Sequence, residues 1–92
     1  MVNAIVLINV KRGHVNDVAQ RLVQLDGVTE VFSVAGRYDL VAILRTRTNE
    51  RIADLVTRDI MAIDAIERTE TLLAFQVFSE YDLAAMFSIG LD

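Results

Sequence analysis

The chain has 92 residues, a net charge of −4 and no cysteine. A chain of this length fits one domain, and without cysteine it has no disulfide framework, no thiol chemistry and no Cys-based metal site. The acidic balance argues against an electrostatic surface for DNA or RNA. Because 53% of the residues are hydrophobic, so small a domain exposes apolar surface, and we expect at least a dimer. The longest early apolar run, Ala4–Ile8, is too short for a signal peptide or a membrane span, so we expect a cytoplasmic protein.

The first half of the chain predicts a strand, a helix and a hairpin. Val2–Val10 is apolar on both alternating faces, which is typical of a strand covered on both sides. Apolar residues then recur at helical spacing between Gly13, the expected N-cap, and Gly27, the expected residue after the helix; they are Val15, Val18, Ala19, Leu22 and Leu25. Val28–Arg45 holds two runs of β-forming residues separated by Gly36–Asp39, which predicts a hairpin loop where Gly36 takes a positive φ.

The second half predicts one more helix and one more strand. Thr48 or Asn49 caps this helix, whose buried stripe is formed by Ile52, Leu55, Val56, Ile60 and Ile63. The last strand runs from about Arg68 to Phe78. We expect residues 1–78 to form the domain and residues 79–92 to form a C-terminal extension. Ser79 and Asp82 in that extension resemble a capping box ahead of a short helix with an apolar face.

The predicted order β-α-β-β-α-β is one βαβ unit used twice. Leu25–Val28 and Ile63–Ile66 hold similar residues 38 positions apart, each between a helix and a strand. We therefore expect an α+β, ferredoxin-like fold with a four-stranded antiparallel sheet in the order 4-1-3-2. That order gathers several polar residues at one end of the sheet, with Arg45 and Arg47 at the other end; they are Lys11, Arg12, Gly36, Arg37, Tyr38, Asp39, Thr69 and Thr71.

Most catalytic interpretations lack the residues that they need. His14 is the one histidine, and no nucleophile elbow, zinc-protease motif or phosphate loop occurs. We interpret His14 as a polar residue at a helix start, and the carboxylates as solvated residues of helix faces and element ends. Arg45, Arg47 and Arg51 could clamp a phosphate, but with Glu50 and Asp54 beside them we favour a solvated edge. We expect no catalytic residue, no metal and no cofactor.

The Gly36–Asp39 loop offers the groups that a small amino acid needs. Backbone N–H groups and Arg37 suit a carboxylate, and the Asp39 carboxylate suits an ammonium group. Thr69 and Thr71 could add hydroxyl groups, although threonine is common at a strand start. The alternative is that Gly-Arg-Tyr-Asp simply makes a turn in which Asp39 accepts hydrogen bonds from nearby N–H groups.

The span Val2–Phe78 resembles the RAM domain, the effector-binding half of the Lrp/AsnC (feast/famine) transcriptional regulators. The resemblance is carried by Val-Thr-Glu-Val-Phe-Ser-Val-x-Gly-x-Tyr-Asp-Leu at Val28–Leu40 and by Arg-Thr-Glu-Thr at Arg68–Thr71. It implies a dimeric α/β-barrel type of assembly in which sheets pair and dimers form a ring. It also implies that amino acids bind at dimer–dimer contacts beside the loop, near Gly36, Tyr38 and Asp39, with Thr69 and Thr71 as further candidates.

Two differences from the family pattern affect the expected function. The regulators carry an N-terminal helix-turn-helix, whereas this chain opens on its first strand, so we expect a stand-alone RAM protein without direct nucleic-acid binding. The extension at 79–92 is not needed by a minimal RAM domain. We expect an amino-acid effector, a homodimer and higher ring, and transcriptional influence through full-length Lrp/AsnC partners, with no membrane partner. The alternatives are a monooxygenase-like enzyme of the dimeric α/β-barrel type and a scaffold without ligand.

Overall fold

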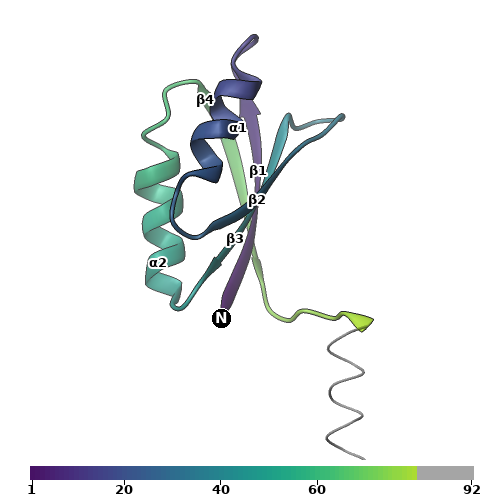
Figure 1. Ribbon diagram of the computed structural model, residues 1–92, viewed down its shortest axis with the longest axis vertical. Helices are drawn as coiled ribbons and strands as arrows, with labels where there is room; N and C mark the ends of the chain where they lie inside the picture. The colour runs from purple at the N-terminus through teal and green to yellow at the C-terminus, as the bar shows by residue number, and fades with distance from the viewer. Residues whose placement is uncertain (81–92) are drawn as a thin grey trace, which may run out of the picture.

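The structure is a computed structural model that describes residues 1–80. Its elements follow the predicted order β-α-β-β-α-β (Figure 1), and the second helix continues directly into a π-helical segment. They are β1 (Val2–Val10), α1 (Val15–Val23), β2 (Val28–Ser33), β3 (Leu40–Thr46), α2 (Asn49–Asp54), the π-helix η1 (Leu55–Ile60) and β4 (Ile66–Ala74). No helix in this part of the chain is long and apolar enough to cross a membrane.

The four strands form one antiparallel sheet in the order β2-β3-β1-β4, which is the predicted order read from its other edge. In the centre of the sheet, Ile8 of β1 pairs with Leu40 on one side and Thr69 on the other. The end of β1, the β2–β3 loop and the start of β4 therefore meet at one end of the sheet, as predicted. Arg45 pairs with Asn3 at the opposite end.

One face of the sheet is covered by the helices, and the other face has no cover within residues 1–80. Alternate residues of β1 and β3 are buried, and they form one core with Val18, Leu22, Ile52 and Leu55 from the helical segments. The intervening residues form the open face, which we define as Ile5, Leu7, Phe32, Val41, Ile43 and Leu72. Phe32 is 47% exposed and Leu72 is 45% exposed, so this face presents apolar side chains to solvent in a single chain.

The helix starts differ from the sequence prediction in one case and agree in the other. The prediction of Gly13 as the N-cap of α1 is wrong, because Gly13 turns the chain at φ +85° and His14 occupies the cap position without a side-chain cap hydrogen bond. Gly27 lies three residues beyond the C-cap Gln24, rather than directly after the helix. The α2 cap is confirmed, since the Thr48 hydroxyl accepts the Arg51 N–H at 3.2 Å.

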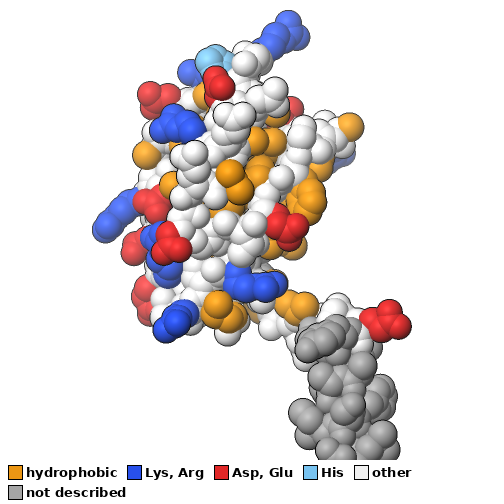
Figure 2. Space-filling model, viewed as in Figure 1, with side chains coloured by type: hydrophobic (Ala, Val, Ile, Leu, Met, Phe, Trp, Pro, Cys, Tyr) orange, Lys and Arg blue, Asp and Glu red, His pale blue; other side chains and the backbone are white. Residues whose placement is uncertain are grey.

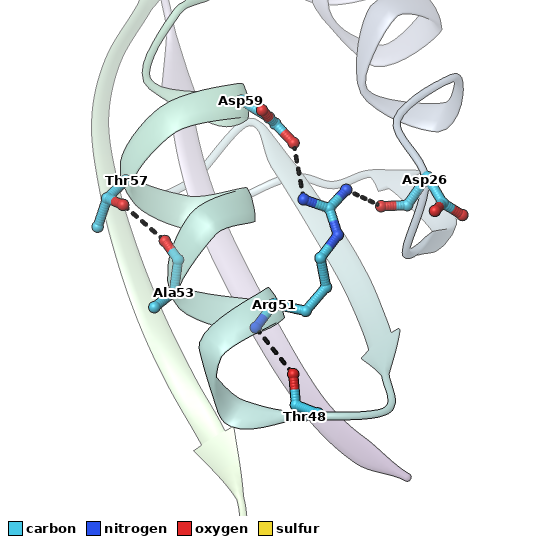
Figure 3. Close-up of polar contacts among 6 residues, drawn as sticks. All are labelled: Asp26, Thr48, Arg51, Ala53, Thr57 and Asp59. Atoms are coloured by element: carbon cyan, nitrogen blue, oxygen red, sulfur yellow. Dashed lines mark hydrogen bonds and ion pairs between the residues drawn. The ribbon is translucent and has the colours of Figure 1, made fainter.

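The second helix widens into the π-helix η1, which the apolar pattern did not predict. In a uniform α-helix, residues eight positions apart are displaced by roughly 80° around the axis. A π turn needs more residues per turn, and it brings Asp59 back towards the side of Arg51. The two side chains pair at 3.3 Å, while the Thr57 hydroxyl donates to the Ala53 carbonyl at 2.7 Å (Figure 3).

The last strand ends earlier than predicted. β4 stops at Ala74, which pairs with Asn3 near the beginning of β1, so the following residues have no strand beside them to continue the ladder. The chain then leaves the sheet as an extended segment (Figure 1). Phe75 is 99% exposed and Phe78 is 75% exposed. The short helix predicted within 79–92 lies outside the described residues from position 81 onward.

Candidate functional site

The loop between β2 and β3 has six residues, from Val34 to Asp39, rather than the predicted four. It is closed by the Val34 N–H, which donates to the Asp39 carbonyl at 3.0 Å. Gly36 has φ +133°, which confirms the predicted positive φ, and no neighbouring atom lies within 4 Å of the position a Cβ would take. Gly36 is thus selected by backbone conformation and not by close packing.

Asp39 fastens this loop to the central strand. Its Oδ2 accepts the Val10 N–H at 2.8 Å, and its own N–H donates to the Ile8 carbonyl at 2.9 Å. The contact occurs where the β1–β4 register shifts between Asn9 and Val10, so the carboxylate satisfies an N–H group at an irregular point of the ladder. A carboxylate can accept several hydrogen bonds, and Asp39 is only half-buried. Asp39 therefore combines a structural role with remaining capacity to accept a hydrogen bond from a ligand.

Tyr38 connects the loop with the far edge of the sheet. Its hydroxyl donates a hydrogen bond to Oε2 of Glu70, a β4 residue that pairs with Leu7. This hydrogen bond to Glu70, with smaller contributions from desolvation and the negative charge of Glu70, raises the pKa of Tyr38 above 10.0. Arg68 and Arg37 act in the opposite direction, so the raised pKa identifies the Glu70 contact as the dominant influence on Tyr38.

The six residues predicted for the site divide between the two faces of the sheet. Gly36 and Arg37 lie exposed in the loop, and Tyr38 contacts the carboxylate of Glu70 at the margin of the open face. Thr69 and Thr71 pair with Ile8 and Val6, which are buried on the helix-covered face. Thr71 lines a groove of about 260 Å³ together with Ile52, Val56 and Leu73. Arg37, Tyr38 and Asp39 thus lie together in the loop, whereas Thr69 and Thr71 lie on the helix-covered face of the sheet.

Sequence reasoning missed two partners of this site. Glu70 lies within the Arg68–Thr71 string, but only the threonines on either side of it were predicted as site residues. Alternation along a strand could have found it, because Glu70 necessarily faces away from Thr69 and Thr71. The Val10 N–H carries no side-chain signal, so its contact with Asp39 could not be read from residue types.

The chain matches the family model described as the Lrp/AsnC ligand binding domain over residues 3–83. It is 32% identical over 77 residues to the HTH-type transcriptional regulator FL11 of Pyrococcus furiosus, covering 84% of this chain and 50% of that regulator. This chain therefore spans about half the length of the curated relatives it matches.

Solved structures agree in fold. TTHA0845 from Thermus thermophilus is 41% identical with a TM-score of 0.82, covering 87% of this chain and 100% of that one. AsnC of E. coli is 27% identical with a TM-score of 0.77, covering 83% of this chain and 52% of that one. From the family match, the curated relatives and the shared four-stranded fold, we conclude that this chain belongs to the Lrp/AsnC ligand-binding domain family.

Proposed function

We propose that the protein is an amino-acid-binding regulatory domain that works as an assembly of identical chains. The observation that carries this proposal is the position of the Val34–Asp39 loop, which lies at the margin of an uncovered apolar sheet face in a domain of a ligand-binding family. The binding of a ligand there can depend on how the chains assemble, because the hydrogen bond between Tyr38 and Glu70 joins the loop to the open face.

The open face is the proposed dimer interface. Its six apolar residues, Ile5, Leu7, Phe32, Val41, Ile43 and Leu72, come from all four strands. Burial of such side chains against a second copy contributes about 25 cal/mol for each Å² of apolar surface removed from water. The exposed Phe75 and Phe78 add further apolar surface beyond the last strand, which a second copy could also bury. The second copy supplies a matching sheet without requiring a different partner.

Ligand recognition is proposed to use both ends of the amino acid. Arg37 is exposed in the loop and can pair with the carboxylate, while the Asp39 oxygen that does not receive Val10 can accept from the ammonium group. Gly36 leaves space for the ligand to approach the backbone, since no atom lies within 4 Å of its Cβ position. Contacts between dimers beside the loop then complete the binding site. Thr69 and Thr71 stay candidates for a ligand that reaches the edge of β4.

A regulatory rather than catalytic role fits the interior of the domain. In the described part of the chain, the buried residues between helices and sheet are apolar except for Thr46, whose hydroxyl donates to the Thr48 carbonyl at 2.8 Å. A monooxygenase-like enzyme needs polar or metal-ligating groups in that space. With a net charge of −4, we propose that the protein influences transcription in the cytoplasm by assembling with full-length Lrp/AsnC regulators, and not by touching DNA itself.

A thermal-shift screen of the twenty amino acids, combined with light scattering, tests this function. A ligand that binds the native state raises the melting temperature by mass action. We expect one or a few amino acids to raise it in a saturable manner, and the scattering mass to be that of a dimer or a multiple of it. A monomer with no response to any amino acid at millimolar concentration would contradict the proposal. A dimer without a response would favour the scaffold.

A further inference from the structure

A second concave site lies at the end of the sheet opposite the loop. It is a cavity of about 330 Å³ between the start of β1, the turn before β2 and the end of β3, and it is lined by Met1, Asp26, Gly27, Arg45, Thr46, Arg47 and Arg51. Figure 2 shows some of the basic side chains at this lower end of the molecule, where Figure 1 marks the N-terminus, and others at the upper end. None of its lining residues belongs to the Val34–Asp39 loop or to the threonines of β4.

The walls of this cavity carry the opposite charge to the whole protein. The lining includes three arginines, Arg45, Arg47 and Arg51, and one acidic residue, Asp26, in a chain whose net charge is −4. Glu50 and Asp54 are the acidic neighbours for which the sequence favoured a solvated edge here. They do not line the cavity, and they form no ion pair within residues 1–80. Asp59 neutralises Arg51 in part. A local positive excess persists even when Asp59 is counted.

Two of the arginines are held in place by contacts that leave other N–H donors available. Arg51 donates to the Asp26 carbonyl at 2.8 Å and to Asp59 at 3.3 Å, and so bridges the π-helix and the turn before β2 (Figure 3). Arg45 donates through Nε to the Asn3 side chain at 2.8 Å. A guanidinium group has more donors than these contacts use. The Arg47 side chain forms no hydrogen bond or ion pair with any described residue.

We propose that this cavity binds a compact oxyanion with two negative charges, either a phosphate monoester or a dicarboxylate. Arginine suits both because its planar donors match phosphate and carboxylate oxygens in pairs. The volume is near the lower limit of small-molecule sites, which span roughly 300–1,000 Å³, and it therefore favours a small metabolite. Arg45 and Arg51 form fixed parts of the wall, and Arg47 is the arginine that can close on the anion.

The test is a thermal-shift titration of the full chain with inorganic phosphate and, separately, with succinate, against chloride at equal ionic strength. Arg47→Gln removes one cation without breaking a contact of the described structure, so the fold should be unchanged by circular dichroism. Arg58→Gln is the matched control, because Arg58 is exposed on η1, does not line the cavity, and changes the charge by the same amount.

We expect saturable stabilisation of the wild type by at least one of the two anions, and the stronger response identifies the class of ligand. Loss of a charge-assisted contact should weaken this binding about tenfold or more in Arg47→Gln and leave it unchanged in Arg58→Gln. Absence of saturable stabilisation by both anions would overturn the proposal. So would equal weakening in the two variants, or wild-type affinity in Arg47→Gln.

Discussion

Replacing Asp39 tests whether its carboxylate both holds the loop in place and binds a ligand. Asp39→Ala removes the acceptor of the Val10 N–H, which lies 2.8 Å from Oδ2 at the shift in the β1–β4 register. Hydrogen bonds to charged groups contribute about 1.5–3 kcal/mol. Because Asp39 is half-buried and water can reach the site, we expect a loss near the lower end of that range. For a domain of this size each kcal/mol lowers the melting temperature by about 4–8 °C.

Asp39→Asn separates the two roles of the side chain. The amide oxygen still accepts from Val10, so most of the stability should remain, whereas the negative charge available to a ligand is lost. Thermal unfolding should therefore rank the proteins as wild type, then Asp39→Asn, then Asp39→Ala. Asp64→Ala is the control, since Asp64 is an exposed aspartate without a side-chain contact among residues 1–80. Equal melting temperatures for Asp39→Ala and Asp64→Ala would refute the structural role of the carboxylate.

Glycine substitutions, the Tyr38 titration and the exposed phenylalanines give three more tests. Gly36→Ala should lower the free energy of unfolding by about 1–3 kcal/mol, because its φ of +133° is unfavourable for alanine. Gly27→Ala combines φ +104° with a Cβ position 2.7 Å from Leu55 Cδ1, so it should unfold at a lower denaturant concentration than Gly36→Ala. If Gly36→Ala unfolded at the lower concentration, the packing around Gly27 would be contradicted. The difference in ultraviolet absorbance between wild type and Tyr38→Phe should show Tyr38 ionising with a midpoint above pH 10.0, and Glu70→Gln should move this midpoint back towards 10.0. The stabilisation from the Tyr38–Glu70 hydrogen bond is present at neutral pH and is lost as pH rises through the raised pKa of Tyr38. The same midpoint in wild type and Glu70→Gln would exclude this hydrogen bond. Phe75→Ser combined with Phe78→Ser should make the oligomer dissociate at higher protein concentration by light scattering, whereas Val23→Ser, on the exposed surface of α1, should not; dissociation unaffected by the double change would mean that these rings remain in solvent.

Strand order and core were predictable because they depend on alternation and chain direction. Val2–Val10 matched its strand at both ends. Of the stripe predicted for the second helix, Ile52, Leu55 and Ile60 are buried in it and Val56 is half-buried, whereas Ile63 is buried beyond the end of η1 at Ile60. The positive φ of Gly36 followed from the need to reverse the chain. These features need only local residue types and the handedness of crossovers.

The remaining features depend on contacts between distant backbone groups. The sequence allows two interpretations of Asp39, either as the partner of a ligand ammonium group or as the acceptor of N–H groups in its own turn. Neither interpretation foresaw the contact with Val10, because a backbone N–H at a register shift has no signature in the residue type. The end of β4 at Ala74 is set by the length of its neighbour β1 and not by the apolar residues that continue to Phe78. The π turn brings Asp59 to Arg51, and the two side chains pair. This ion pair helps to hold Arg51 in the wall of the cavity, whereas the sequence indicated that the arginines there form a solvated edge.

Calorimetric titration of the wild type and Asp39→Asn, with the amino acid that stabilises the wild type most, tests the proposed function most directly. Light scattering on the same samples establishes that both proteins have the same oligomeric mass. We predict that binding weakens about tenfold or more in Asp39→Asn, as the loss of a charge-assisted contact requires, with the assembly unchanged. Equal affinity in the two proteins would contradict the account, since the Asp39 charge would then play no part in holding the amino acid.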